Sequence, residues 1–204
     1  MILIPEIQTV VILVPRTGSG TLRRALLARY SNAMMIYRHM EADGVPQGYD
    51  RWAKVGVVRH PVDRLWSLYR FLQNFSGNHD PAYINAMRSS VDLPFSEWIV
   101  RNETVFTSPY DRAGKDRFFA GFTVRHPMPE NVKSQFFYLR PDLGTRVWAF
   151  GELALLGASL GVDLSDRYNA TDEKAAPALT EAAEDHVKRF FQWDLRAARA
   201  GVVA

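Results

Sequence analysis

One segment near the start of the chain combines a cation, hydroxyl groups and glycines at a spacing suited to holding an anion. Its residues are Pro15, Arg16, Thr17, Gly18, Ser19, Gly20, Thr21 and Leu22. The apolar run 10–14 precedes it and helix-forming residues follow it. A buried strand that ends in a glycine-rich turn before a helix directs backbone N–H groups and the positive helix end at one point. Arg16 would add a fixed charge and the hydroxyls would donate to the anion, so we expect a phosphate cradle. An ordinary strand–turn–helix junction is the alternative.

A second segment carries two more arginines and a serine. Residues 54–59 read as a strand, and Pro61 then opens a helix at a favourable first-turn position. The apolar stripe expected on that helix consists of Val62, Leu65, Trp66, Tyr69 and Leu72. Arg59, at the strand end, could converge on one anionic group with Arg64 and Ser67, which lie on another helix face. Taken singly, each of these polar residues also suits a solvated surface.

Both segments resemble the nucleotide signatures of the sulfotransferases that use 3′-phosphoadenosine 5′-phosphosulfate (PAPS). The segment 15–22 is similar to the 5′-phosphosulfate loop of that family, P-K-[TS]-G-[ST]-[ST]-[ST]-L. The segment 58–69 is similar to its 3′-phosphate element, V-R-[DN]-P-x-x-R-x-x-S-x-Y. Three residues depart from the family pattern: Arg16 replaces Lys, Gly20 replaces a hydroxyl residue and His60 replaces Asp or Asn. A guanidinium can still neutralise the leaving oxygen, but it is a weaker proton donor than an ammonium.

The resemblance is closest to the branch that includes carbohydrate sulfotransferases, and it implies a fold, a co-substrate and a set of site residues. The implied fold is a three-layer P-loop-like α/β fold with a central parallel sheet flanked by helices. PAPS would be the co-substrate and 3′,5′-ADP the product, with the residues from Arg16 to Leu22 at the 5′ end and Arg59, Arg64 and Ser67 at the 3′-phosphate. The acceptor would be a hydroxyl of a carbohydrate or other small molecule. The resemblance extends over about residues 9–198 and includes Gln135, Phe150 to Leu153, and Asp194.

The acceptor hydroxyl needs a base, and His39 is our first choice. It follows the apolar run 33–37, and residues after the carboxyl ends of parallel strands line the crevice of an α/β sheet. A positioned base contributes about 10²–10⁴ in rate, and histidine titrates near neutral pH. In several carbohydrate sulfotransferases a base histidine also lies between the two nucleotide elements. Glu41 is the rival, by analogy with relatives that use a carboxylate, and a merely solvated histidine is the third possibility. Arg16, Glu41 and His39 are thus the candidate catalytic residues.

Hydrophobic patterning predicts one domain over residues 1–204. Strands are expected near 9–14, 33–37, 54–59 and 146–150, and helices near 19–30, 61–74, 130–138, 152–160 and 179–198. This alternation favours a parallel sheet covered on both faces. The N-terminal apolar stretch, interrupted by Pro5 and Glu6, reads as a strand and is too short to span a membrane. Thr180 is the expected N-cap of the last helix, and His60 is read as a capping residue.

The span from Phe75 to Pro129 is predicted to be irregular and to determine acceptor specificity. Rings there could stack on sugar faces and cations could hold an anionic glycan, although roughly half of the rings are expected in the core. The aromatic residues are Tyr83, Phe95, Trp98, Phe106, Tyr110, Phe118, Phe119 and Phe122. The cations are Arg88, Arg101, Arg112, Lys115, Arg117 and Arg125.

Composition bounds the remaining possibilities. The chain has no cysteine, and its five histidines show no metal-ligand spacing, so no metal is expected. The same lack of cysteine, without a signal-peptide pattern, favours a soluble cytoplasmic protein. A net charge of +3 raises a nucleic-acid-binding module as an alternative, but the charge is spread along the chain, so no nucleic-acid or membrane partner is expected.

Two further alternatives concern the nucleotide. A P-loop kinase or hydrolase would need a Lys-Ser or Lys-Thr pair after Gly20 and an acidic residue to help hold magnesium, and neither is found. A PAPS-binding protein without turnover would keep the nucleotide segments alone. The sequence leaves the acceptor and the oligomeric state open.

Overall fold

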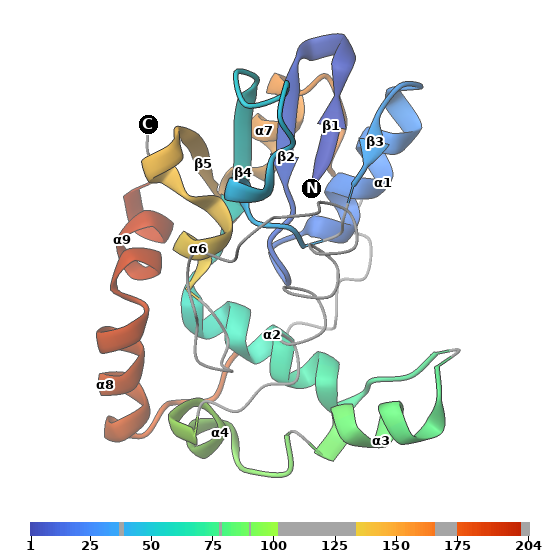
Figure 1. The fold of residues 1–204 in the computed structure, drawn as a ribbon. Helices are drawn as coiled ribbons and strands as arrows, with labels where there is room; N and C mark the ends of the chain where they lie inside the picture. Colours follow the sequence, from blue (N-terminus) through green and yellow to red (C-terminus); the bar gives the residue numbers. More distant parts are fainter. Residues whose placement is uncertain (37–38, 78, 90, 102–133, 166–174, 201–204) are drawn as a thin grey trace.

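The chain folds as an α/β structure with a mixed five-stranded sheet flanked by helices (Figure 1). The computed structural model describes residues 1–36, 39–77, 79–89, 91–101, 134–165 and 175–200. The strands are β1 (Ile2–Ile4), β2 (Thr9–Ile12), β3 (Met34–Met35), β4 (Ala53–Val58) and β5 (Thr145–Ala149). Their order in the sheet is β3-β1-β2-β4-β5.

The sheet is only partly parallel. β2, β4 and β5 run parallel, with Val11 paired to Val55 and Val57 to Trp148. β1 is antiparallel to both β2 and β3, so the prediction of a wholly parallel central sheet is wrong. The cause is the short link between β1 and β2, a single 3-10 turn over Pro5–Ile7. A link of this length closes a hairpin, whereas a parallel crossover needs a dozen or more residues.

The helices agree in part with the sequence pattern. They are α1 (Ser19–Arg29), α2 (Pro61–Gln73), α3 (Pro81–Ser89), α4 (Phe95–Arg101), α6 (Gln135–Leu139), α7 (Leu153–Ser159), α8 (Glu181–Phe190) and α9 (Gln192–Ala200). Short 3-10 turns follow Glu41 (Ala42–Gly44), precede β5 (Pro141–Leu143) and lead into α7 (Phe150–Glu152). The predictions for 19–30, 61–74 and 152–160 are confirmed within a few residues. The helix expected over 130–138 is described only from Ser134 onward.

The single closing helix predicted over 179–198 is wrong, because α8 and α9 are separate. The break falls at Phe191, which leaves helical geometry with φ −122° and ψ 28° and buries its side chain. The two helices pack against different parts of the fold: α8 contacts α4, whereas α9 contacts β4 and β5. Thr180 does occupy the N-cap position of α8, but its side chain makes no capping hydrogen bond.

The irregular span predicted from Phe75 to Pro129 contains two helices, α3 and α4, in its described part. Phe95 and Trp98 of α4 are buried in the core and are therefore not exposed to an acceptor. Helix α4 was not predicted because its apolar spacing extends over only seven residues. The remaining candidate rings from Phe106 to Phe122, and the cations from Arg112 to Arg125, lie outside the described residues.

Side chains alternate between the two faces of the sheet, and helices cover both. On one face, α1 and α7 pack on a cluster formed by Ile2, Ile4, Val11, Leu13, Leu22, Leu26, Tyr30, Val55, Val57, Trp148, Leu156, Leu160 and Leu164. On the other face, α6 and α9 pack on a cluster formed by Met1, Leu3, Val10, Ile12, Val14, Met40, Ala42, Val58, Tyr138, Leu139, Val147 and Ala197. The switch of face at each residue is the two-residue period of a strand.

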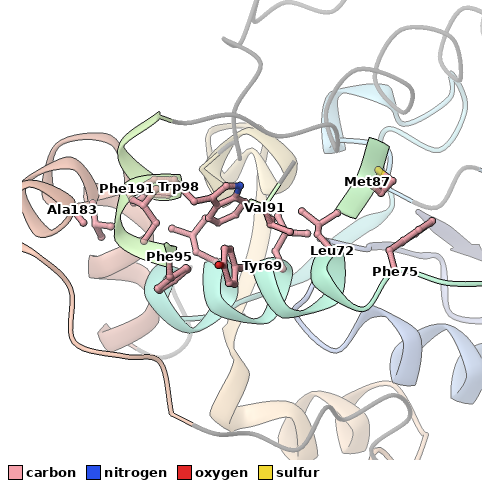
Figure 2. Packing of buried hydrophobic residues seen from close by; sticks show 13 residues of the cluster. Tyr69, Leu72, Phe75, Met87, Val91, Phe95, Trp98, Ala183 and Phe191 are labelled. Atoms are coloured by element: carbon pink, nitrogen blue, oxygen red, sulfur yellow. The ribbon is translucent and has the colours of Figure 1, made fainter. Parts of the chain in front are cut away.

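A third hydrophobic cluster lies among the helices α2, α3, α4 and α8, away from the sheet (Figure 2). Tyr69 is packed edge-on against Phe95 and Trp98, with ring centroids 5.3 and 5.4 Å apart. The stripe predicted on α2 is confirmed, because Leu65, Tyr69 and Leu72 are buried in this cluster and Val62 and Trp66 pack against it.

One close approach seats α6 on the central strand β4. A Cβ atom added to Gly56 would lie 2.2 Å from Leu139 Cδ2, closer than real Cβ contacts. Glycine inside a strand often marks such an approach. The seat brings the start of α6 to the end of β4, where Arg59 follows.

Candidate anion-binding site

The first turn of the site joins β2 to α1. Arg16 and Gly18 both adopt left-handed backbone conformations, with φ of 66° and 78°. Between them Thr17 is buried and its Oγ1 donates a hydrogen bond to the Val14 carbonyl at 3.0 Å. Gly18 is the N-cap residue of α1 and has no side chain to cap the helix. The first N–H groups of a helix have no carbonyl one turn earlier to bond to, so this end of α1 suits an anion.

The Arg16 side chain is held by α2, the helix that follows β4. Its Nε and Nη2 atoms donate to Ser67 Oγ at 3.1 and 3.0 Å, and its guanidinium lies 4.8 Å from the centroid of the Phe71 ring. Ser67 and Phe71 lie four positions apart on α2 and therefore share a face. Ser67 was expected beside Arg59 at a 3′-phosphate, whereas here its hydroxyl binds the cation of the other segment.

Arg59 brings a second cation to the same place. Its Nη1 donates to the Arg16 carbonyl at 3.5 Å, and its guanidinium lies 4.7 Å from the centroid of the Phe150 ring. Burial, together with the nearby charge of Arg59, lowers the pKa of Arg16 to about 10, so Arg16 is still charged at pH 7. Within the described parts of the chain, Arg16 forms no ion pair with a carboxylate. Two cationic side chains thus lie close together after the ends of β2 and β4, an arrangement that suits an anion.

Arg64 faces a different environment. Its side chain is 1% exposed, and the charges of Asp194 and Tyr138 oppose the lowering of the Arg64 pKa that burial causes. Burial raises the pKa of Asp194, while Arg64 and the hydrogen bonds from Ser134 and Gln135 act in the opposite direction. Arg64 is thus placed beside a buried carboxyl, and its contact with a ligand remains a prediction.

His39 reaches the end of β2 from the segment that follows β3. Its ring is buried, and Nδ1 lies 2.8 Å from the Leu13 carbonyl oxygen. Because a carbonyl only accepts, Nδ1 carries a proton, so in the neutral form of the ring the lone pair is on Nε2. This is the tautomer that a general base needs. Glu41 is also buried, two residues further along the chain, and the choice between the two as base remains a prediction.

β3 delivers His39 although it lies at the edge of the sheet. It is antiparallel to β1, which is antiparallel to β2, so β3 runs in the same direction as β2. The carboxyl ends of both strands therefore lie at the same end of the sheet. His39 thus follows a strand that points the same way as β2 but does not pair with it, and its role as a base remains a prediction.

Several residues of the site had no predicted role. The two ring partners, Phe71 and Phe150, received none, although the four-residue spacing between Ser67 and Phe71 is a usable signal. Gln135 and Asp194 belonged to the family resemblance without an assigned function. Nothing in their local sequence indicates that they meet, because they lie 59 residues apart.

Two features are absent from the described ranges: a metal-binding group and a membrane-spanning helix. No group of three or more His, Cys, Asp or Glu suited to a metal ion occurs among these residues. None of the helices within the same ranges combines the length and apolar character needed to cross a membrane.

Comparisons with models of protein families, with curated proteins and with solved structures find no match for the chain.

Proposed function

We propose that the chain is a PAPS-dependent sulfotransferase that acts on a hydroxyl of a carbohydrate or another small hydroxylated molecule. The observation that supports it is the meeting of Arg16 and Arg59, which follow the ends of two parallel strands, with no carboxylate paired to Arg16 in the described parts of the chain. The sequence elements around them resemble the two nucleotide signatures of that family. The finer fold that we propose is P-loop-like, with the parallel strands β2, β4 and β5 as its centre.

The proposed reaction uses four groups of the site. The acceptor oxygen attacks sulfur, the bond from sulfur to the 5′-phosphate oxygen breaks, and the acceptor proton moves to Nε2 of His39. Arg16 and the N–H groups at the start of α1 would stabilise the charge that develops on the leaving phosphate. Arg59 would hold the 3′-phosphate.

Ligand discrimination by thermal unfolding tests the proposal. 3′,5′-ADP at about 100 times its Kd stabilises a protein by about 2.7 kcal/mol. For a domain of this size we expect a rise in Tm of roughly 5–10 °C. 5′-ADP and ATP should give much smaller shifts, and EDTA should change none of them. A positive result would be followed by assays with labelled PAPS and panels of glycans, phenols and alcohols.

Each contrary outcome identifies another class. A shift from ATP with magnesium and none from 3′,5′-ADP would contradict sulfuryl transfer and favour a kinase or hydrolase. Strongly salt-dependent binding of unrelated DNA, without competition by 3′,5′-ADP, would indicate a nucleic-acid-binding module. Binding of 3′,5′-ADP with no turnover on any acceptor would indicate a nucleotide-binding protein.

A further inference from the structure

A buried polar network joins the starts of α6 and α9 to the end of β4. The Gln135 side chain bonds to both backbone groups of Arg59: Oε1 accepts from Arg59 N at 2.9 Å, and Nε2 donates to the Arg59 carbonyl at 2.7 Å. Asp194 Oδ1 accepts from Gln135 N at 2.8 Å and from Gln135 Nε2 at 2.7 Å. Ser134 Oγ donates to the other carboxylate oxygen of Asp194. Gln135 and Asp194 are both fully buried.

The pattern of donors and acceptors allows only one orientation of the Gln135 amide. The Arg59 N–H must meet an acceptor, and the Arg59 carbonyl and the Asp194 carboxylate must each meet a donor. An amide carries one oxygen and two N–H groups, and here all three are used. The side chain is therefore fixed at both ends.

We call the Gln135 side chain, held by Asp194, the clamp. It bonds to the backbone at a point where the pairing of β4 in the sheet has ended. The pairing of β4 with β5 ends at Val58, and α2 begins at Pro61. Between them Arg59 receives its backbone partners from Gln135, 76 residues later. The position of its guanidinium depends on where this backbone lies.

The positive charge that acts on Asp194 comes from α2, the helix that follows Arg59. Arg64 of α2 is buried close enough to Asp194 for its charge to act on that carboxyl. Buried charges are tolerated when they are paired and hydrogen-bonded, and removal of one partner leaves the other uncompensated. Asp194 thus connects α6, α9 and α2 around the backbone of Arg59.

We infer that Gln135, anchored by Asp194, is a positioning residue that sets the Arg59 guanidinium for the 3′-phosphate of the nucleotide. The inference rests on the proposed function and deepens it. Gln135 itself need not touch the ligand. Its effect passes through Arg59, so it should change the preference between nucleotides and not only the stability of the fold.

A double-mutant cycle on the full chain tests this, with isothermal calorimetry of 3′,5′-ADP and 5′-ADP. Arg59→Ala should weaken 3′,5′-ADP roughly 10- to 150-fold, the range for a lost charge-assisted bond. Gln135→Leu should weaken it about three- to tenfold and leave 5′-ADP within about twofold. In the Arg59→Ala background, Gln135→Leu should cause no further loss, because the side chain that it positions is gone.

Two other variants separate positioning from stability. Tyr30→Phe removes a buried hydrogen bond, from Tyr30 Oη to the Leu160 carbonyl at 2.6 Å, beyond the far end of α1, and should not alter the ratio of the two affinities. Ser134→Ala loosens Asp194 while keeping Gln135, and should change that ratio in the same direction by a smaller factor. It carries the test if Gln135→Leu does not fold.

Equal losses for both nucleotides, or additive losses in the double variant, would overturn the inference. If the wild-type chain shows no preference for 3′,5′-ADP, the proposed function fails, and the same cycle is then measured with inorganic phosphate. Phosphate binding that Arg59→Ala and Gln135→Leu weaken without additivity would retain the positioning role. Phosphate binding that is absent or unaffected by both variants would remove it as well.

Discussion

The two turns of the candidate site are stabilised by different means. The turn from β2 to α1 is shaped by its own residues, since Arg16 and Gly18 adopt left-handed conformations and Thr17 bonds to Val14, three positions earlier. In the turn from β4 to α2, the backbone of Arg59 is held by Gln135, 76 positions away. The backbone conformation of the first turn follows mainly from nearby sequence, although its Arg16 side chain is held by Ser67 of α2. A turn of the second kind exists only once the helices have packed.

This difference suggests a division of labour. The first turn joins the start of α1 to the buried His39 ring, which bonds to Leu13 at the end of β2. The second turn contributes a cation whose placement can be tuned from a distance. We therefore expect changes at the first turn to affect turnover or folding, and changes around the second to affect the choice of nucleotide.

The largest expected effect is on turnover. His39→Ala should lower the rate with labelled PAPS by about 10²–10⁴ and leave 3′,5′-ADP affinity nearly unchanged, because it removes a base and not a nucleotide contact. The acceptor must have a hydroxyl of high pKa, since an acidic phenol needs little help to lose its proton. Glu41→Ala is the matched variant and should be mild. Near-normal turnover in His39→Ala with a large loss in Glu41→Ala would assign the base to the carboxylate.

The next effect is on folding and concerns the first turn alone. Gly18→Ala should destabilise the protein by about 1–2 kcal/mol or slightly more, because a residue with a Cβ is strained in the left-handed region. The new Cβ would also lie 3.3 Å from Leu153 Cδ1. Gly144→Ala is the control: its φ of 80° is almost the same, but its Cβ would meet nothing within 4 Å. Denaturant unfolding should show a larger loss for Gly18→Ala, and equal losses would mean that the contact with Leu153 adds nothing.

The smallest expected effect is on nucleotide affinity, and it tests the contact between Ser67 of α2 and Arg16 of the first turn. Ser67→Ala should weaken 5′-ADP and 3′,5′-ADP alike, by roughly two- to tenfold, because the hydroxyl binds Arg16 of the first turn. Ser159→Ala, which removes a hydroxyl bonded within α7, is the control and should change neither affinity. A loss confined to 3′,5′-ADP would return Ser67 to the 3′-phosphate, where the sequence pattern had placed it.

Local signals in the sequence predicted the parts of the molecule that depend on neighbouring residues. The glycine-rich turn before α1 and the buried stripe of α2 follow from turn chemistry and helical spacing. The direction of β1 was not predicted, because it depends on how the short link at Pro5–Ile7 closes. The separation of α8 from α9 was also missed, since it depends on Phe191 packing between elements far apart in the chain.

The candidate site follows the same rule. Arg16, Arg59 and His39 were found from their places after apolar runs, and the structure brings the first two into contact. Their contacts with Phe150 and with the Ser134–Asp194 network depend on tertiary packing, which no local pattern in one sequence reveals. Phe71 could have been found only from its four-residue spacing to Ser67 on α2. The contact between Ser67 and Arg16 also joins two segments that local reasoning treats separately.

The close seat of α6 on β4 connects a core position to the candidate site through Gln135. At Gly56 an added methyl group would come too close to the Leu139 side chain, so either that side chain or α6 would have to shift. Gln135 lies about one helical turn from Leu139 and would move with the helix. On the inference that Gln135 positions Arg59, we expect a larger residue at Gly56 to change the ratio of the 3′,5′-ADP and 5′-ADP affinities. Substitutions at this buried glycine would then test the proposed recognition as well as the packing.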